Sequence, residues 1–451
     1  MKAGSRIVIM GGGESGVGAA ILAKDKGFDV FLSDFGTLHP KYKQILIEEN
    51  IPFEEGTHTP EKILNADMVI KSPGIPPTAP LVVELTDKGT PVVSEIEFAA
   101  LFTNAKMVCI TGSNGKTTTT LMIYHILKKA GLDAGLAGNV GNSLALQVAR
   151  DPHDIYVVEL SSFQLENMYK FKANVAVILN ITPDHLDRYE GKMENYAAAK
   201  FRILQNQTKD DFFVYWQDDP LIRHQVEQIQ TEACLLPFGI KAEDGTAAFL
   251  DNGIVRFTLP GDVWEIPRDQ ISLSGLHNLF NNMAAGLSAS ALKVKNEKIR
   301  EALEDFEAVE HRLEYVATVD GVRYVNDSKA TNVNSTWYAL ESMEGNVILI
   351  LGGKDKGNDY TEIEDLVKEK VKTLVCMGKD NSKLMKFFKD KVPSIYDTGS
   401  IKEALDCCRK VAADGDTVLL SPACASFDLF SSYEDRGRQF KEIVKSFEKN
   451  S

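Results

Sequence analysis

The chain has 451 residues, of which 44% are hydrophobic and 25% are charged, and its formal net charge is −14 at pH 7. At roughly 100–200 residues per domain this length predicts about three domains, and the composition is that of globular proteins with buried cores. The acidic balance argues against sequence-independent binding to nucleic acid or to an anionic membrane. A local basic pocket for phosphates is still compatible with it.

The six cysteines form neither a C-x-x-C pair nor a zinc-type spacing, so we expect reduced thiols in a cytoplasmic protein. The apolar run at the start of the chain is too short for a signal peptide, and no later segment approaches 18 uninterrupted apolar residues. We therefore expect no membrane anchor. The absence of a coiled-coil heptad or an apolar interface stripe favours a monomer.

Short β-branched runs alternate with longer helical patterns along almost the whole chain. This rhythm predicts βαβ units around mainly parallel sheets, and therefore an α/β fold. Runs that are apolar at consecutive positions, such as 175–181 and 347–351, suit strands covered on both faces. The predicted strands are 6–10, 28–32, 67–72, 107–111, 156–161, 175–181, 347–353, 373–378 and 417–423.

The first domain boundary is predicted near residues 94–105, because a complete set of strand and helix patterns precedes it and a fresh strand follows. The second lies near 305–310, after a helical pattern at 296–305 and before a hairpin that turns at Asp320-Gly321. Shorter strands and turns between 212 and 273 predict a small antiparallel addition to the middle domain. The predicted domains are residues 1–95, 96–308 and 309–451.

A glycine-rich motif, TGSNGKTT, gives the sharpest local signal. It directly follows an apolar strand and precedes a helical run, which is the order that a phosphate cradle requires. Lys116 supplies a positive charge and the Thr117 hydroxyl can ligate Mg²⁺. The usual G-x-x-x-x-G-K-T would need glycine where Ile110 stands, so this loop is a shortened variant. The predicted phosphate-binding residues are Gly112, Ser113, Asn114, Gly115, Lys116, Thr117 and Thr118.

Two further strands place polar side chains at the same predicted sheet edge. Glu159 ends one strand, where a carboxylate can hold Mg²⁺, although a strand-end glutamate alone is usually structural. The next strand runs into TPDHLDR, which brings His185 to that edge. Lys200 lies in a helical stretch, where sequence physics alone predicts an ordinary solvated lysine.

Near the N-terminus, Gly11-x-Gly13-x-x-Gly16 follows the first strand, and Asp34 ends the second at about the ~20-residue spacing of a ribose-binding acid. NAD, FAD and UDP-type ligands all fit this pattern, and a tight turn without a ligand fits it as well. An NAD-dependent oxidoreductase and a non-catalytic nucleotide-binding regulator therefore stay open. The stronger phosphate loop in the next domain argues against both, because it indicates nucleoside triphosphate chemistry.

Polar clusters also follow strands in the third domain, in the motifs EHR, NDSKATN and GGKDKG. Their cations Arg312, Lys329 and Lys356 complement carboxylates or phosphates, although each charge alone is more often solvated surface. A last strand ends in SPACASFD, where Cys424 has no evident base, so we expect no catalytic thiol there.

The chain resembles the Mur ligase family of bacterial cell-wall synthesis through nine segments in fixed order: TGSNGKTT, ELSSFQLE, NITPDHLDR, the segment around Lys200, GLHNLFNN, EHR, NDSKATN, GGKDKG and SPACASFDLF. The resemblance implies an N-terminal Rossmann-like domain that holds a UDP moiety. It also implies a central P-loop ATPase domain and a C-terminal Rossmann-like domain that closes over ATP and an amino acid.

The segments GGGESG and SPACASFDLFSSYEDRG resemble most the family members that add D-glutamate to UDP-N-acetylmuramoyl-L-alanine. The implied reaction is ATP-dependent amide bond formation through an acyl phosphate, in peptidoglycan precursor synthesis. An L-alanine-adding Mur enzyme and folylpolyglutamate synthase are the alternatives within the ligase class. The latter typically lacks an N-terminal UDP-binding domain, so residues 1–95 argue against it.

The resemblance implies a role for each matching position. The implied catalytic residues are Lys116, His185 and a carbamylated Lys200. The implied Mg²⁺ ligands are Thr117, Glu159, His185 and Lys200. The implied nucleotide-side residues are Asn278, Asn281, Arg312, Asp327 and Lys329. The implied contacts to the UDP-linked substrate are Ser15, Asp34, Asn139, Ser161 and His185, and those to D-glutamate are Thr331, Lys356, Ser426, Phe427 and Tyr433.

Two positions near these sites have no assigned ligand contact. Phe35 and Gly36 follow Asp34 where relatives offer a hydroxyl or a basic side chain. The uridine contacts beyond the glycine loop therefore stay open, with Phe35 either stacking on the base or packing into the protein. For His311, the middle residue of EHR, we expect a structural role.

Overall fold

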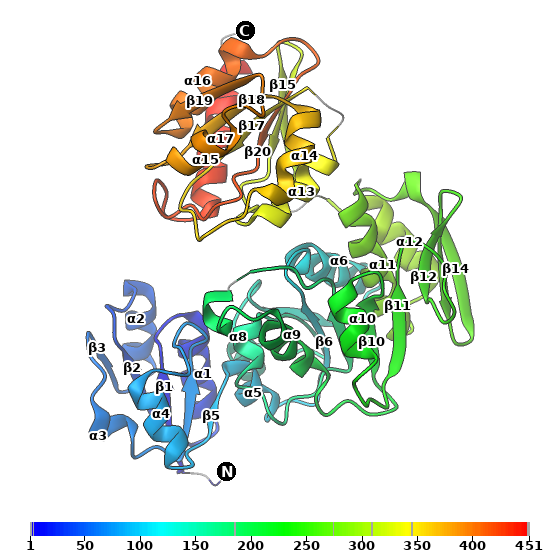
Figure 1. Cartoon of the computed structure of the whole chain (residues 1–451). Helices are drawn as coiled ribbons and strands as arrows, with labels where there is room; N and C mark the ends of the chain where they lie inside the picture. Colours follow the sequence, from blue (N-terminus) through cyan, green and yellow to red (C-terminus); the bar gives the residue numbers. More distant parts are fainter. Residues whose placement is uncertain are drawn as a thin grey trace. The chain divides into compact units, whose positions relative to one another are not determined.

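The computed structural model describes residues 2, 4–184, 186–273, 275–307, 310–343 and 346–448. The chain forms two compact units (Figure 1), one made of residues 1–272 and 280–306 and the other of residues 273–279 and 307–451. The first unit contains two sheets and the second contains one. Among the described residues, no helix is both long and apolar enough to cross a membrane.

The N-terminal sheet has five parallel strands in the order β3-β2-β1-β4-β5. Its strands are β1 (Arg6–Met10), β2 (Asp29–Asp34), β3 (Phe53–Glu55), β4 (Met68–Lys71) and β5 (Val92–Val93). The helices of this region are α1 (Glu14–Asp25), α2 (Pro40–Glu48), α3 (Pro60–Ile63), α4 (Pro80–Asp87) and α5 (Glu95–Ala100). Because β2 and β4 lie on opposite sides of β1, the strand order reverses there, which is where α/β sheets bind ligands.

The middle sheet has nine strands in the order β14-β13-β12-β11-β10-β9-β6-β8-β7. They are β6 (Lys106–Thr111), β7 (Ala134–Gly138), β8 (Ile155–Glu159), β9 (Val175–Ile178), β10 (Phe212–Trp216), β11 (Cys234–Phe238), β12 (Ala248–Asp251), β13 (Ile254–Leu259) and β14 (Asp262–Pro267). Only the β12-β13 and β13-β14 pairs are antiparallel among these. The predicted antiparallel addition to a parallel sheet is confirmed.

The helices of the middle region are α6 (Lys116–Lys129), α7 (Leu144–Arg150), α8 (Ser162–Leu165), α9 (Met193–Phe201), α10 (Pro220–Val226), α11 (Leu276–Ala291) and α12 (Asn296–Asp305). Three short 3₁₀ turns, η1 (Leu186–Tyr189), η2 (Arg202–Leu204) and η3 (Arg268–Gln270), complete it. The predicted helix at 296–305 is confirmed to the residue. The strand predicted over 175–181 is too long, because β9 ends at Ile178 and the chain then turns toward the glycine-rich loop.

The third sheet has six strands in the order β15-β16-β20-β17-β18-β19. They are β15 (Glu314–Val319), β16 (Val322–Asn326), β17 (Val347–Leu351), β18 (Val371–Met377), β19 (Ser394–Thr398) and β20 (Thr417–Leu420). Its helices are α13 (Val333–Glu341), α14 (Thr361–Lys370), α15 (Ser382–Phe388), α16 (Ile401–Val411) and α17 (Tyr433–Glu448). The β15-β16 hairpin turns at Asp320 and Gly321 with φ of 51° and 76°, as predicted.

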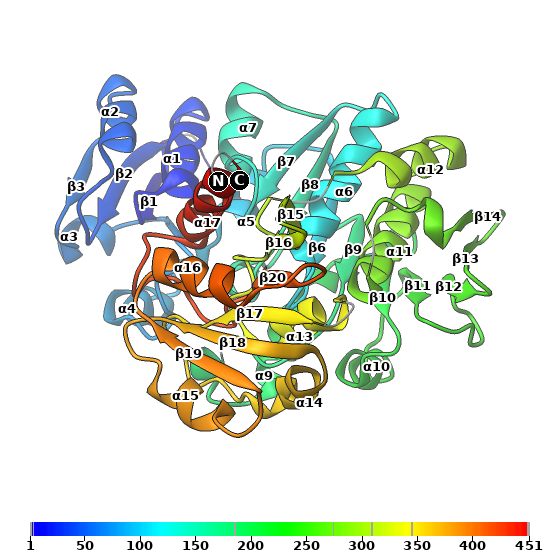
Figure 2. The same ribbon diagram turned by 90° about the horizontal axis from the view of Figure 1, so that it is seen from above.

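Helices cover both faces of this third sheet (Figure 2), with α13, α14 and α15 on one side and α16 and α17 on the other. Along β17 the side chains alternate between the two layers. Leu349 packs into the core beneath α13 and α14, and the adjacent Ile348 and Ile350 pack beneath α16 and α17. A strand with no polar face is therefore required at this position, as the continuous apolar run indicates.

A buried carboxyl group joins the N-terminal and middle parts of the first unit. Glu95, the first residue of α5, accepts hydrogen bonds from the Ser143 hydroxyl at 2.7 Å and from the Ala145 N–H at 2.6 Å. Gly18 of α1 packs against the same serine, since an added Cβ would lie 2.1 Å from Ser143 Oγ. Burial raises the pKa of Glu95 to about 7, and the charge of Glu14 adds to this effect, while the hydrogen bonds from Ser143 and Ala145 oppose it.

Replacing Glu95 by Gln should make the free energy of unfolding less dependent on pH. Between pH 4.5 and 7 the folded protein holds a proton on Glu95 that the unfolded chain releases, so stability falls as pH rises through this window. At pH 8 the loss in the wild type amounts to about 3 kcal/mol by linkage. We expect E95Q to be more stable than the wild type at pH 8 in urea titrations, and to lose this advantage at pH 5.

Glu97→Gln provides the matched control on the same helix. Glu97 is also buried, but its carboxylate accepts the backbone N–H groups of Tyr169, Lys170 and Phe171 at 2.8–3.1 Å. An amide would turn an NH₂ group toward these donors, so E97Q should be less stable at both pH values. Equal destabilisation of both variants at pH 8 would contradict the raised pKa of Glu95.

Candidate functional site

The TGSNGKTT segment forms a loop between β6 and α6, in the predicted order of strand, loop and helix. Gly115 precedes α6 with a left-handed φ of 81°, and an added Cβ would lie 2.4 Å from Asn281 Oδ1. Gly112 has a φ of 150°, which side chains rarely adopt. Both glycines are therefore dictated by the backbone path, and the N-terminus of the 14-residue helix α6 faces this loop.

Lys116 opens α6 and lies across its own loop. Its Nζ donates hydrogen bonds to the carbonyl oxygens of Gly112 and Ser113, each at 2.8 Å. A positive charge thus stands where phosphate oxygens would meet the loop. The neighbouring side chains of Ser113, Asn114, Thr117 and Thr118 are buried.

The segment after β9 holds the phosphate loop in place. The Ser113 N–H donates to the Asn180 carbonyl at 2.9 Å, and the Asn114 N–H donates to Asn180 Oδ1 at 2.8 Å. The Thr182 N–H in turn donates to Ser113 Oγ at 2.9 Å. Sequence reasoning missed Asn180 and Thr182 because it extended the strand through position 181. Asn180, a polar residue within this otherwise apolar run, was the signal in the sequence that the strand ends earlier.

Glu159 ends β8, whose register pairs it with Ile110 at the start of the loop. The side chain is 5% exposed, and its Oε2 has no hydrogen-bond partner among the described residues. A buried carboxylate oxygen without a donor is costly unless a cation compensates it. The Glu159 carboxylate and the hydroxyl of Thr117, in the first turn of α6, are hard oxygen donors of the kind that magnesium prefers.

Lys200, on α9, is 1% exposed and is not the solvated lysine that its local sequence predicts. Its Nζ donates to the Gly112 carbonyl at 2.8 Å and lies 4.5 Å from the centre of the Tyr196 ring. Burial lowers the pKa of Lys200 well below its usual value, and the charge of Lys116 lowers it further. His185, the other predicted residue of this region, lies outside the described residues.

The N-terminal glycine loop lies at the carboxyl ends of β1 and β2. The Gly12 N–H donates to Asp34 Oδ2 at 2.5 Å and the Gly36 N–H donates to Asp34 Oδ1 at 2.7 Å. The two carboxylate oxygens of Asp34 therefore hold the glycine loop and the turn that follows β2 in place. Phe35 is 74% exposed and lies 5.8 Å from the ring of His58, so it does not pack into the core. Ser15 lies in the first turn of α1.

Two other predicted substrate residues have structural contacts that the sequence reading missed. Ser161 is the N-cap of α8 and forms a capping box with Gln164, a pairing that the spacing S-x-x-Q signals. Asn139 is exposed, and its backbone N–H donates to the Glu159 carbonyl at 3.0 Å. Both residues thus lie at the carboxyl edge of the sheet that carries the phosphate loop.

In the second unit, Arg312 stands between two residues with left-handed backbone. The φ angles are 65° at His311 and 45° at Leu313, which is strained for both side chains. Asp327 accepts the Ser421 hydroxyl at 2.9 Å and the Leu313 N–H at 3.2 Å. Burial raises the pKa of Asp327 to about 7, and the nearby charge of Arg312 opposes this shift.

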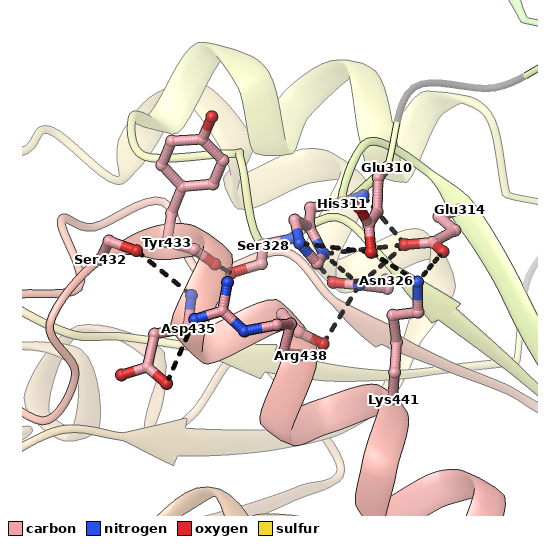
Figure 3. Close-up of polar contacts among 11 residues, drawn as sticks. Glu310, His311, Glu314, Asn326, Ser328, Ser432, Tyr433, Asp435, Arg438 and Lys441 are labelled. Atoms are coloured by element: carbon pink, nitrogen blue, oxygen red, sulfur yellow. Dashed lines mark hydrogen bonds and ion pairs between the residues drawn. The ribbon is translucent and has the colours of Figure 1, made fainter. Parts of the chain in front are cut away.

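His311 has the structural role expected of it (Figure 3). It is 4% exposed, its Nδ1 lies 2.9 Å from Asn326 Nδ2, and its N–H donates to Glu314 at 2.9 Å. Lys441 of α17 pairs with both Glu310 and Glu314. Glu310, His311 and Glu314 are close enough to suggest a metal site, but the ammonium group of Lys441 already pairs with both carboxylates and would repel a metal cation.

Arg436 organises the predicted amino-acid side of this unit and was missed by sequence reasoning. It is fully buried and donates to the Ser328 hydroxyl at 2.9 Å, to the Ser328 carbonyl at 2.8 Å and to the Cys424 carbonyl at 3.2 Å. It thereby joins the NDSKATN and SPACASFD loops. Its position within an amphipathic helix gave no signal of burial.

The predicted residues fall into two groups, one in each unit. The loop residues, Glu159, Lys200 and Asn281 belong to the first unit, and Asn281 accepts the Thr119 hydroxyl at 3.2 Å. Lys329 of the second unit lies 5.6 Å from the Tyr433 ring. In that unit Ser426 is buried, while Lys356 and Phe427 are exposed and Thr331 is partly buried. Asn278, although it lies on the same helix as Asn281, groups with the second unit.

Comparison with known proteins agrees with this arrangement. Residues 6–81 match the MurD N-terminal domain, residues 110–289 the Mur ligase middle domain and residues 311–424 the Mur ligase, glutamate ligase domain. UDP-N-acetylmuramoylalanine--D-glutamate ligase of Bacteroides thetaiotaomicron is 58% identical over 98% of this chain and 99% of its own length. The enzyme of the same name from Porphyromonas gingivalis W83 is 59% identical over 97% and 98%.

Solved structures share the fold at lower identity. A pseudomurein peptide ligase type C from Methanothermus fervidus has a TM-score of 0.63 at 20% identity, covering 98% of this chain and 99% of that one. MurF ligase from Thermotoga maritima in complex with ADP has a TM-score of 0.63 at 18% identity, covering 94% and 96%. With three matching domains and relatives of this identity over nearly the whole length, the chain belongs to the Mur ligase family.

Proposed function

We propose that this protein is an ATP-dependent ligase that joins D-glutamate to UDP-N-acetylmuramoyl-L-alanine in peptidoglycan precursor synthesis. The observation that carries the proposal is the phosphate loop together with the buried, unpartnered oxygen of Glu159 and the buried Lys200. Relatives named for this reaction are 57–59% identical over nearly the full length. Neither a dehydrogenase nor a non-catalytic regulator explains a phosphate loop together with the strand-end Glu159 and His185.

The chemistry follows from the electronic nature of the substrate carboxylate, which is a poor electrophile. Its oxygen attacks the γ-phosphorus of ATP and ADP leaves, which gives an acyl phosphate. Lys116 and the N-terminus of α6 stabilise the negative charge on the transferring phosphoryl oxygens. The amine of D-glutamate then attacks the acyl carbon, loses a proton and displaces phosphate, leaving an amide.

Thr117, Glu159, His185 and a carbamylated Lys200 would hold Mg²⁺, which when bound neutralises charge on the phosphates. The carbamate forms when the neutral amine of Lys200 attacks CO₂ and loses a proton. Burial favours the neutral amine by lowering the pKa of Lys200. The modification replaces a cation by an anionic oxygen ligand, which is the type of ligand that Mg²⁺ prefers.

We assign the remaining predicted residues by the ligand that the family resemblance implies for each. Ser15, Asp34, Asn139 and Ser161 of the first unit serve the UDP-linked substrate. Asn278, Asn281, Arg312, Asp327 and Lys329 serve the nucleotide, and Thr331, Lys356, Ser426, Phe427 and Tyr433 serve D-glutamate. We keep the division into residues 1–95, 96–308 and 309–451. We infer a cytoplasmic location, with which the six free cysteines agree, and a monomer, since the sequence contains no coiled-coil heptad or apolar interface stripe.

The direct test is phosphate release from ATP in the presence of UDP-N-acetylmuramoyl-L-alanine and one amino acid at a time. We expect release with D-glutamate and background rates with L-glutamate, L-alanine, glycine and diaminopimelate. Release with UDP-N-acetylmuramate and L-alanine instead would assign the chain to the L-alanine-adding enzymes. No release with any pair would overturn the proposal.

Replacing Lys116 by Ala should lower kcat about 100-fold or more, because a positioned charge at the transferring phosphoryl group is lost. Lys128→Ala is the control, since Lys128 lies on the same helix but is exposed at its far end. We expect steady-state phosphate release of K128A to match the wild type. Near-normal turnover by K116A would refute the assignment of the phosphate loop.

Lys200→Ala should also be inactive, but short carboxylic acids such as formate or acetate should restore part of its activity. The added carboxylate would occupy the space of the carbamate and supply the missing anionic oxygen. Phosphate release measured against carboxylate concentration checks this, with K116A as the variant that must not respond. Failure of every short acid to raise the rate of K200A would speak against the carbamate.

A further inference from the structure

Arg188 connects the N-terminal and middle parts of the first unit beside the candidate site. It belongs to the 3₁₀ turn η1, in the segment that follows Thr182. Its Nη1 donates to the carbonyl of Pro73 at 2.9 Å, a residue of the turn that follows β4. The side chain is 16% exposed, so this hydrogen bond is largely shielded from water.

The turn at residues 72–75 forms one wall of the N-terminal glycine loop. The Ser72 N–H donates to the carbonyl of Met10 at 2.8 Å, and an added Cβ on Gly11 would lie 2.7 Å from Ser72 Cβ. Lys71, which is 2% exposed, closes the turn by donating to Ser72 and Ile75 carbonyls at 3.2 and 2.7 Å. A displacement of this turn would therefore displace the glycine loop.

Other parts of the Arg188 guanidinium group contact Phe163 of α8 and Glu166, which directly follows that helix, while its Nε has no hydrogen-bond partner among the described residues. The guanidinium carbon of Arg188 lies 4.0 Å from the centre of the Phe163 ring, and its Nη2 lies 3.3 Å from Glu166 Oε2. Glu166 also accepts the Tyr189 hydroxyl at 2.7 Å. The planar fork of arginine can serve a carbonyl and a carboxylate while stacking on a ring, which a lysine cannot do.

Upstream, the same chain segment is tied to the phosphate loop. Asn180 and Thr182 hydrogen-bond to Ser113 and Asn114 at 2.8–2.9 Å. Side-chain contacts also link this loop to Arg188: Ser113 Oγ lies 3.3 Å from the Tyr196 hydroxyl, and the Tyr196 and Tyr189 ring centres are 5.2 Å apart. Because Tyr189 donates to Glu166, the partner of Arg188, these contacts run from the phosphate loop to the 72–75 turn beside the glycine loop. In the proposed reaction these two loops hold the two molecules that must react with each other.

We propose that Arg188 is a positioning residue that sets the distance between the UDP-linked substrate and the γ-phosphate of ATP. This inference rests on the proposed function. Arg188 would act through the 72–75 turn, without touching the reacting atoms. Phosphoryl transfer depends on alignment, and a misplacement of about 1 Å can cost about 100-fold in rate without loss of binding.

The test compares Arg188→Met with Arg202→Met. Arg202 donates to the Leu165 and Met168 carbonyls at the end of α8 and lies 5.6 Å from the Tyr169 ring, so it resembles Arg188 in its contacts but does not reach the 72–75 turn. Thermal unfolding, kcat and the KM for each substrate are measured for both variants. Hydroxylamine in place of D-glutamate traps the acyl phosphate as a hydroxamate and reports the first step alone.

We expect kcat and hydroxamate formation in R188M to fall about 30- to 100-fold, with the KM for ATP within about twofold of the wild type. Arg188→Lys should restore thermal stability better than it restores kcat, because it keeps the charge next to Glu166 without the fork. R202M should lose stability with kcat nearly unchanged. A kcat of R188M within threefold of the wild type, or equal kcat losses in R188M and R202M, would overturn the inference.

The wild-type protein in the same assay separates the two proposals. If it forms no product from UDP-N-acetylmuramoyl-L-alanine and D-glutamate, the proposed function fails. If it forms product and R188M does so equally well, only the positioning role of Arg188 fails.

Discussion

Two lysine side chains share one backbone carbonyl at the centre of the first unit, since Lys116 and Lys200 both donate to Gly112 at 2.8 Å. Two ammonium groups so close together in a buried place repel each other, and burial of Lys200 makes its charged form costlier still. The neutral amine relieves this repulsion, and so would an anionic ligand. The backbone at Gly112 has a φ of 150°, a conformation that residues with side chains rarely adopt.

The surrounding structure keeps this loop rigid from several directions. Strand β9 ends at Ile178, and in the segment that follows it Asn180 and Thr182 hydrogen-bond to the phosphate loop. Elsewhere in the unit, Glu95 of α5 and Ser143, the N-cap of α7, join these two helices, and Gly18 allows α1 to approach them. The N-terminal sheet is thus attached to the middle sheet both through a buried carboxyl group and through Arg188. Such attachment is what a reaction between two separately held substrates requires.

The sequence predicts those parts of the structure that local pattern determines. Continuous apolar runs predicted buried strands such as β17, because both faces of that strand are covered. The strand β7, with the sequence AGLAG, was missed because its glycines break the β-branched pattern. Gly135 is needed there for packing, since an added Cβ would lie 2.4 Å from His153. The local sequence wrongly predicted a solvated Lys200, because the carbonyl that its ammonium group contacts, that of Gly112, lies 88 residues away in the chain. Only the resemblance to a family carried that information.

The second unit shows a different limit of sequence reasoning. The charges of EHR and NDSKATN indicated binding to anions, but not that the backbone would be strained at His311 and Leu313 on both sides of Arg312. Each such residue costs about 1–3 kcal/mol unless surrounding contacts impose it. Those contacts are present: His311 is fixed by Asn326 and by α17, while the Leu313 N–H is held by the buried Asp327. Asp327 therefore stabilises the backbone next to Arg312. A direct contact between Asp327 and the nucleotide would be a second role of the same carboxyl group. The carboxyl group of Asp327 is hydrogen-bonded to the Leu313 N–H and the Ser421 hydroxyl, and the charge of Arg312 acts on it from nearby. These hydrogen bonds hold the backbone on one side of Arg312 in place.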